Sequence, residues 1–212
     1  MFEQPDLYNA DCMEAMKEFP DKFFDLAMID PPYGNANEEV FRTGGTWANK
    51  YGTKIKAWDN APGEDFFKEL FRVSKNQVIW GGNYFTLPPT RCFLIWEKLS
   101  ISEDFTMAMA EYAWTSFNGN AKVYKCAPQG TVNDKRFHPT QKPVSLYQWI
   151  LDKYAKKGDK VLDTHCGSAS SLIACHRAGI DGWGFEIDRD YYKQAKLRLD
   201  RERDQVSIFE LI

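Results

Sequence analysis

Phe24-Asp25-Leu26-Ala27-Met28-Ile29-Asp30-Pro31-Pro32-Tyr33-Gly34 joins a short apolar run to an abrupt acidic and proline-rich end. The run from Leu26 to Ile29 predicts a buried strand. Prolines lack the amide donor that a strand ladder needs, so the strand must end at Asp30 and a rigid loop must begin. Ligands of open α/β sheets bind at the carboxyl ends of the strands. We therefore expect Asp30 to face a ligand site.

The four residues Asp30, Pro31, Pro32 and Tyr33 offer an acceptor carboxylate, rigid backbone carbonyls and a flat aromatic face. This set suits an exocyclic amino group on a planar base, because Asp30 and the Pro31 carbonyl can each accept one N–H while Tyr33 stacks on the ring. A plain proline turn after a strand is the simpler interpretation of part of this set. The complete tetrad after an apolar strand favours the binding site.

The composition is that of one α/β domain spanning residues 1–212, with 43% hydrophobic residues and no evident linker. The net charge is -3, so any nucleic-acid surface must gather its basic residues locally. Five cysteines without a C-x-x-C pair favour reduced thiols in a cytoplasm and disfavour disulfides or a metal site. The N-terminus does not resemble a signal peptide, and no apolar run reaches membrane-spanning length, so we expect no membrane contact.

Periodicity and end signals predict the remaining elements. Strands are expected over 7–9, 77–80, 93–96, 111–117, 121–126, 160–163 and 182–188, and helices over 12–19, 64–73, 143–154, 172–177 and 189–203. The last helix alternates charges of both signs, which is typical of a solvated face. Strands 111–117 and 121–126 are expected to form a hairpin turning at 118–120. The fold class is therefore a largely parallel, doubly wound α/β sheet with an antiparallel hairpin at its edge.

The last third of the chain carries a nucleotide-binding pattern: a strand ending at Asp163, a loop of small residues and a helix N-terminus. About 23 residues further on, Glu186 occupies the place where an acid can accept both hydroxyls of a ribose. Only Gly167 is present where a dinucleotide fingerprint has three glycines, so NAD is disfavoured. A phosphate-free nucleoside with a carboxylate, S-adenosylmethionine, fits better. An ordinary βαβ crossover explains the loop alone, and the spaced acid favours the cofactor.

Basic and aromatic residues alternate between Val40 and Trp58 without any acid, within the long aperiodic segment 35–62. Such a surface can neutralise phosphates and stack bases. A solvated loop with some buried aromatics explains the pattern equally well. The candidate nucleic-acid-binding residues are Arg42, Trp47, Lys50, Tyr51, Lys54 and Lys56, with a second cluster at Lys135 and Arg136.

Five segments in one order resemble the DNA amino-methyltransferases, in the permuted class whose catalytic tetrad precedes the cofactor loop. They are Asn9-Ala10-Asp11-Cys12, Asp30-Pro31-Pro32-Tyr33, His138-Pro139-Thr140-Gln141-Lys142-Pro143, the loop 162–170 and Gly184-Phe185-Glu186-Ile187-Asp188. Thr164, His165 and Ala169 depart from the loop pattern of the family, where a Pro, a Phe and a Gly are usual. For Asp11, helix capping with Glu14 is the competing local explanation.

The resemblance implies a Rossmann-like methyltransferase that uses S-adenosylmethionine. It assigns catalysis to Asp30, Pro31, Pro32 and Tyr33, and the cofactor to Asp11, Cys12, Asp30, His138, Thr140, Gln141, Lys142, Asp163, His165, Cys166, Gly167, Ser168, Ser170, Glu186 and Ile187. The partner it implies is double-stranded DNA whose target base is flipped out of the stack, a property of this enzyme class. Segments 35–62 and 99–137 are then short target-recognition loops, as expected of a small, solitary, phage-like enzyme. A homodimer is the oligomer common among such enzymes.

The implied reaction is direct methyl transfer to the N6 amino group of adenine. Cytosine N4 methylation uses the same chemistry and stays open, as do RNA or a protein amide as the acceptor. A non-catalytic nucleic-acid-binding protein that kept the fold is the alternative of a different class. Cytosine C5 chemistry is disfavoured because the chain has no Pro-Cys pair.

Overall fold

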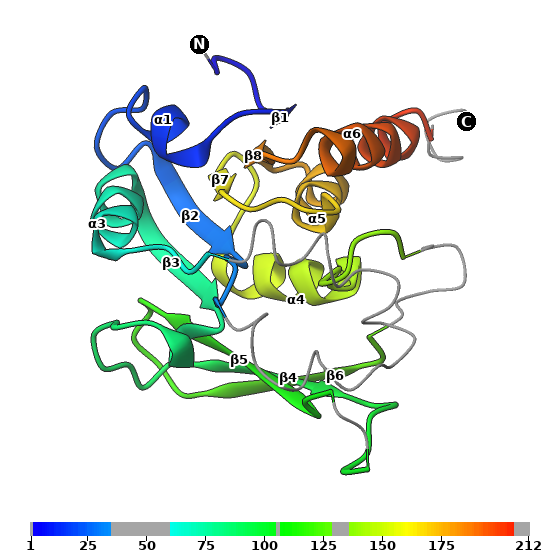
Figure 1. The fold of residues 1–212 in the computed structure, drawn as a ribbon. Helices are drawn as coiled ribbons and strands as arrows, with labels where there is room; N and C mark the ends of the chain where they lie inside the picture. The colour runs from blue at the N-terminus through cyan, green and yellow to red at the C-terminus, as the bar shows by residue number, and fades with distance from the viewer. Residues whose placement is uncertain (1, 35–59, 105–106, 129–135, 206–212) are drawn as a thin grey trace.

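The computed structural model describes residues 2–34, 60–104, 107–128 and 136–205 (Figure 1). These residues form an eight-stranded sheet in the order β1-β8-β7-β2-β3-β5-β4-β6. The strands are β1 Leu7–Tyr8, β2 Phe24–Ile29, β3 Ser74–Trp80, β4 Leu94–Lys98, β5 Ala110–Thr115, β6 Lys122–Cys126, β7 Lys160–Asp163 and β8 Asp181–Phe185. The helices are α1 Cys12–Met16, α3 Glu64–Val73, α4 Val144–Tyr154, α5 Ser170–Ala178 and α6 Arg189–Arg203, with a 3-10 turn, η2, at Gly82–Tyr84.

The predicted elements are largely confirmed, and α3 and α6 have the predicted bounds. The first helix is shorter than predicted and ends at Met16 rather than near Phe19. Strand β3 begins earlier, at Ser74, directly after α3. The largely parallel α/β fold expected from the sequence is the fold observed.

The central strand β2 pairs in parallel with β3 on one side and β7 on the other. Its register with β7 places Ala27 opposite Leu162. Successive residues of β2 belong to different hydrophobic clusters, Leu26 and Met28 to one and Ala27 and Ile29 to the other. Because both faces of β2 are buried, its residues from Leu26 to Ile29 form a continuous apolar run rather than an alternating pattern.

The predicted hairpin between the strands near 111–117 and 121–126 is wrong. Strand β4 lies between β5 and β6, antiparallel to β5 and parallel to β6. The turn residues 118–120 favour a local reversal, but β4 carries the fully buried Leu94 and Trp96 and so belongs in the interior of the sheet. The less buried β6 becomes the edge strand. The expected antiparallel pairing is present, but its partners are β5 with β4 and β3.

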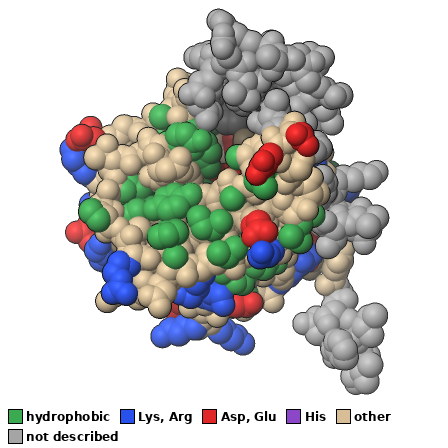
Figure 2. All heavy atoms as spheres, turned by 90° about the horizontal axis from the view of Figure 1, so that it is seen from below, with side chains coloured by type: hydrophobic (Ala, Val, Ile, Leu, Met, Phe, Trp, Pro, Cys, Tyr) green, Lys and Arg blue, Asp and Glu red, His purple; other side chains and the backbone are tan. Residues whose placement is uncertain are grey.

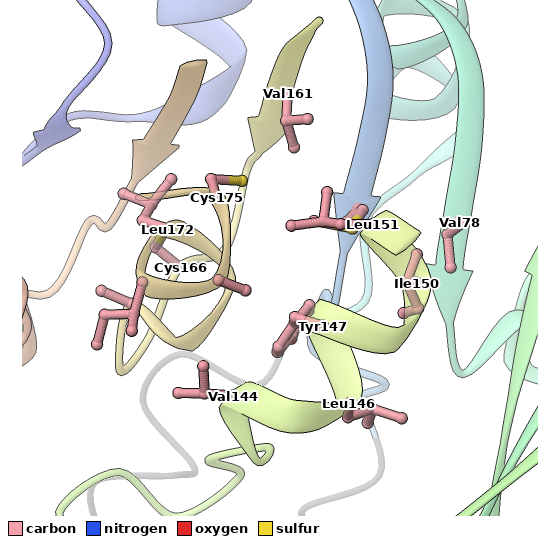
Figure 3. Packing of buried hydrophobic residues seen from close by; sticks show 14 of the residues in the cluster. Val78, Val144, Leu146, Tyr147, Ile150, Leu151, Val161, Cys166, Leu172 and Cys175 are labelled. Atoms are coloured by element: carbon pink, nitrogen blue, oxygen red, sulfur yellow. The ribbon is translucent and has the colours of Figure 1, made fainter. Parts of the chain in front are cut away.

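Helices cover both faces of the parallel part of the sheet, with α1 and α3 on one side and α4, α5 and α6 on the other (Figure 1). On the second side α4 and α5 pack together, with Tyr147, Ile150 and Leu151 directed into the core (Figure 3). Lys142, two residues before α4, bonds Asp30 directly after β2, so the start of α4 lies beside the carboxyl end of β2. The segment before α4, with the predicted cofactor motif, is therefore held at the same edge.

The outer strands leave an apolar area on the underside of the molecule (Figure 2). The registers of β5, β4 and β6 place Tyr112, Ile95 and Val123 side by side across three strands. Across the described ranges, no helix is both long and apolar enough to cross a membrane.

Candidate active site

The Asp30 carboxylate directly follows β2 and is engaged through both oxygens. Oδ1 accepts a hydrogen bond of 2.7 Å from the Tyr33 hydroxyl, and Oδ2 accepts one of 2.5 Å from Lys142 Nζ. The Asp30 side chain is only 12% exposed. Burial raises the pKa of Asp30, and the Lys142 ammonium and the Tyr33 hydroxyl offset part of that rise. Each carboxylate oxygen can accept a second hydrogen bond, so the side chain still has acceptor capacity.

Behind Lys142 lies a chain of buried charges that the sequence reading missed. Lys142 Nζ is 2.9 Å from Glu111 Oε2, and Lys98 Nζ is 2.6 Å from Glu111 Oε1. Although burial acts in the opposite direction, the two lysines lower the pKa of Glu111 to about 2. The pKa of Lys142 is raised despite its burial, because Asp30 and Glu111 both stabilise the ammonium. Two acids and two lysines therefore form a charge-balanced row from the ligand edge into strands β4 and β5.

The ring of Tyr33 is fixed in one orientation. Its hydroxyl is held by Asp30, and its ring lies so close to Gly81 that a Cβ there would be 2.2 Å from Cε1 of Tyr33. Gly81 also has a φ of +65°, which disfavours L side chains. One aromatic neighbour, Tyr84, is stacked on Tyr33. The predicted stacking face of Tyr33 is thus preformed and in contact with another ring.

The loop after β7 is organised by Asp163. Its Oδ1 accepts a 3.0 Å hydrogen bond from the amide of His165, and its Oδ2 accepts one from the Ser171 hydroxyl. Gly167 has a φ of +51° and lies against the His138 ring, 3.1 Å from the position of a Cβ. A side chain at residue 167 would therefore displace the His138 ring. The predicted cofactor loop and the predicted 138–143 motif are in direct contact.

Glu186, directly after β8, is buried beside that loop. Its carboxylate accepts hydrogen bonds from the amides of Gly167 at 2.9 Å and Asp188 at 2.8 Å. Burial raises the pKa of Glu186 to about 7. Next to it, Ile187 is 64% exposed, which is unusual for an isoleucine and leaves an apolar surface available to a flat ring. The Asn9 side chain donates to the Glu186 carbonyl at 2.8 Å and so holds the end of β1 against the end of β8.

Asp11 and Cys12 lie beside the same edge. Asp11 caps α1 by accepting from the amides of Met13 and Glu14, as expected. Glu14 pairs with Lys17 at 2.7 Å, so the reciprocal half of the capping box is not formed. Burial raises the pKa of the Cys12 thiol to about 12, with Asp11 and Glu186 contributing to the rise.

Both histidines of the predicted site are uncharged near neutral pH. Burial lowers the pKa of His138 to about 3 and that of His165 to about 4. His138 packs edge-on against Tyr191 with ring centroids 4.3 Å apart, and His165 packs against Phe66 at 5.5 Å. His165 therefore packs as an aromatic ring, the role that a phenylalanine would have at this position. Thr140 contacts His138 at 3.2 Å.

Arg198 of α6 supports the small-residue loop, another contact that the sequence reading missed. Its Nη1 donates to the Ser168 carbonyl at 2.6 Å and to the Ser170 hydroxyl at 3.0 Å. Ala169 between them has a φ of +60°, which explains why a glycine is favoured at this position. Cys166 lies at 2.3 Å from the position of a Cβ on Gly184, so the loop and β8 are closely packed.

The two predicted halves meet at one edge of the sheet. Continuing the register of β2 with β7 places Asp163 opposite Met28, two residues before Asp30. The pKa of Asp163 is raised to about 6 by its burial, and the nearby charge of Asp30 adds to this rise. The buried Tyr147 of α4 is close enough to both acids for each to raise its pKa further, after burial. The catalytic corner and the cofactor loop therefore line one site.

The nucleic-acid candidates fall mostly outside the described residues, which include none of Arg42, Trp47, Lys50, Tyr51, Lys54, Lys56 and Lys135. Arg136 is described, and its guanidinium donates to the carbonyls of His138 and Pro139, the latter at 2.8 Å. This arrangement gives Arg136 a part in holding the 138–143 segment, and its contact with DNA stays a prediction.

The residues at this edge fit S-adenosylmethionine. Glu186 is a buried carboxylate of the kind that can accept from ribose hydroxyls, Ile187 has an exposed apolar surface that a flat ring could cover, and Gly167 has no side chain to obstruct a ligand. The described ranges hold no cluster of three or more His, Cys, Asp or Glu side chains placed for a metal ion.

Comparisons with known proteins point the same way. The sequence model of the N6_N4_Mtase family, described as DNA methylase, matches residues 89–197. The type II methyltransferase M2.LlaDCHI of Lactococcus lactis subsp. cremoris is 22% identical over 242 residues, covering 92% of this chain and 89% of the relative.

Solved structures show the same fold. The M1.HpyAVI–SAM complex has a TM-score of 0.60 at 20% identity and covers 92% of this chain and 98% of that chain. The PvuII DNA methyltransferase, described as cytosine-N4-specific, has a TM-score of 0.64 at 13% identity and covers 100% and 94%.

Proposed function

Because this chain belongs to the N6_N4_Mtase family of DNA methylases, we propose that it methylates the exocyclic N6 of adenine in DNA. S-adenosylmethionine is the cofactor, and bound at the Glu186 edge it supplies an electrophilic methyl group. The observation that supports this reaction most directly is the placement of Asp30 beside Asp163 on neighbouring strand ends. A base held at Asp30 and a nucleoside held at Glu186 then share one site.

The amino nitrogen of adenine is a poor nucleophile because its lone pair is delocalised into the ring. A hydrogen bond from N6–H to Asp30, and a second to the Pro31 carbonyl, favour a pyramidal nitrogen whose lone pair can attack. Fixed acceptors also stabilise the positive charge that develops on nitrogen as its bond to the methyl carbon forms and the bond from that carbon to sulfur breaks, which would leave a neutral thioether. The nitrogen then releases one proton. The Asp30 carboxylate, whose pKa is raised by burial, accepts it.

Lys142 determines how strongly the Asp30 carboxylate accepts a hydrogen bond in this mechanism. Its ammonium is fully buried and lies between two carboxylates, so part of its charge is balanced by Glu111 rather than by Asp30. Asp30 therefore keeps acceptor strength toward the amino group although Lys142 is 2.5 Å away. No covalent enzyme intermediate is required.

Adenine is preferred to cytosine because the first tetrad residue is Asp30, which resembles the adenine enzymes. Cytosine N4 methylation is the second candidate, favoured by the likeness to the cytosine-N4-specific PvuII enzyme. Methylation of RNA and non-catalytic nucleic-acid binding are the remaining alternatives.

Expression in a methylation-free bacterial host, followed by single-molecule sequencing of the host DNA, tests this proposal. We expect N6-methyladenine within one short sequence motif, and none with Asp30→Asn expressed at the same level. N4-methylcytosine instead would replace the adenine assignment. If the host contains folded protein with bound S-adenosylmethionine but its DNA is unmodified, DNA methylation is excluded as the function.

The further parts of the proposal follow from the same family relationship. The chain acts as one methyltransferase domain in the cytoplasm, on double-stranded DNA with the target base flipped out of the stack. Segments 35–62 and 99–137 read the target sequence. The enzyme is a homodimer that acts without a restriction partner, and it resembles the small enzymes of phages. Analytical ultracentrifugation tests the dimer, and mapping of the methylated motif tests the short target expected from short recognition segments.

A further inference from the structure

The face of Tyr33 that a target base would use is covered by Tyr84. The two rings are stacked, with centroids 4.8 Å apart and planes inclined by 17°. Tyr84 ends the short turn η2, which follows β3 at the edge of the sheet where β2 also ends. This is the geometry that one aromatic side chain and a nucleobase adopt when they stack.

The two tyrosines differ in how firmly they are held. Tyr33 is bonded to Asp30 at 2.7 Å, packed against Gly81 and flanked by Phe85 with ring centroids 6.2 Å apart. Tyr84 is 54% exposed, among the most exposed large hydrophobic side chains that the structure describes. Outward movement of the Tyr84 ring therefore breaks its stack on Tyr33 while much of its surface is already in contact with water.

We infer that Tyr84 is the outer half of a base-stacking clamp whose inner half is Tyr33. The inference rests on the proposed function, because it takes the ligand to be an extruded nucleobase. In the absence of DNA the two rings close on each other. A base that enters between them requires Tyr84 to move outward by about one ring thickness, roughly 3.5 Å, and then stacks on both tyrosines. Tyr84 is thus a positioning residue for the target base.

The clamp is tested with purified protein, unmethylated genomic DNA and tritiated S-adenosylmethionine. We expect Tyr84→Ala to raise the KM for DNA about tenfold or more, the usual loss when one base–aromatic stack is removed. Tyr84→Phe keeps the ring and should stay within about twofold of the wild type. Cofactor affinity and the melting temperature should be unchanged in both variants, since the side chain is exposed.

Tyr124→Ala is the matched control. It also removes a partly exposed ring from a stacked pair, Tyr124 with Trp149 at 5.1 Å, but on strand β6. The clamp is overturned if Tyr84→Ala leaves the KM for DNA unchanged, if it lowers the KM, as expected of a residue that only blocks the base, or if Tyr124→Ala has the same effect. A wild-type enzyme that methylates no DNA would instead overturn the proposed function, and the clamp with it.

Discussion

Lys142 holds the Asp30 carboxylate through a buried ion pair of 2.5 Å, although the two residues are 112 positions apart in the chain. The pair joins the 138–143 segment, which also packs on the cofactor loop, to the residue that follows β2. Through Glu111 and Lys98 it is anchored in the outer strands. The acid proposed to bind the target base is therefore positioned by residues from three separate parts of the sequence.

Replacement of the Asp30 charge should stop methyl transfer without loss of cofactor binding. Asp30→Asn keeps the shape of the side chain but weakens the acceptor and removes the group that takes the proton. We expect the transfer rate to fall by about 10²–10³-fold or more. Calorimetry should give S-adenosylmethionine affinity within a few fold of the wild type, and a tritiated-methyl assay measures the rate. Turnover near the wild-type level would exclude Asp30 from the mechanism.

Removal of one charge from the buried row should destabilise the protein more than removal of two. Glu111→Gln leaves two buried lysines with one acid, Asp30, which pairs with Lys142, so Lys98 loses its carboxylate. An uncompensated buried charge costs about 3–5 kcal/mol. Adding Lys98→Met restores the balance, so the double variant should be more stable than Glu111→Gln alone. Urea unfolding measures both. As a control, Asp65→Asn breaks the exposed Asp65–Lys68 pair of α3 and should leave the free energy of unfolding nearly unchanged. Simple additivity of the two buried changes would argue against the coupled row.

Cofactor affinity should depend on the protonation of Glu186. The pKa of this carboxyl is raised to about 7, so it is ionised above that pH and protonated below it in the ligand-free protein. Only the ionised form accepts hydrogen bonds from both ribose hydroxyls. The affinity for S-adenosylmethionine should therefore be full above about pH 8 and fall as the pH drops through 7, approaching tenfold per pH unit.

Two variants separate the contributions to this pH dependence. Glu186→Gln should bind weakly at every pH and lack the change near pH 7. Asp163, with a pKa of about 6, should add a second decline at lower pH that Glu186→Gln retains. Calorimetry across the range measures both. A wild-type affinity that is constant through pH 7 would refute the ribose assignment.

Gly81→Ala should impair catalysis more than its backbone strain explains. Gly81 and Gly158 both have positive φ, +65° and +89°, so an alanine at either position costs about 1–2 kcal/mol. At Gly158 nothing lies within 4 Å of the added Cβ, whereas at Gly81 it would displace the Tyr33 ring. We expect similar losses of backbone stability, but reduced methyl transfer only for Gly81→Ala. Equal activity in the two variants would show that the position of Tyr33 is unimportant.

Much of the edge where the site lies could be predicted from local sequence. Proline chemistry ends β2 directly before Asp30, and the strand–loop–helix pattern places Asp163 and Glu186 at neighbouring strand ends. Both inferences depend on backbone rules that act within a few residues. The same is true of the Asp11 cap, which the structure forms as expected.

The parts that could not be predicted depend on pairing between distant strands. The wrong hairpin arose because a turn signal is local, whereas the insertion of β4 is decided by burial of Leu94 and Trp96 on an interior strand. Lys98 and Glu111 were overlooked although each lies two residues from a buried residue of its own strand, Trp96 and Ala113. Period-2 spacing therefore placed them on the inward face, but only the pairing of β4 with β5 shows that they meet.

The direct pairing of β2 with β7 has a consequence for the evolution of such chains. Asp6 near the first strand and Arg203 of the last helix form an ion pair of 2.7 Å, so the two ends of the described chain lie together. A gene rearrangement that joined these ends and opened the exposed turn at 156–158 would encode the cofactor loop first and the proline corner later, yet the same strands would still be neighbours. The order of the motifs along the gene can thus change while the pocket is preserved.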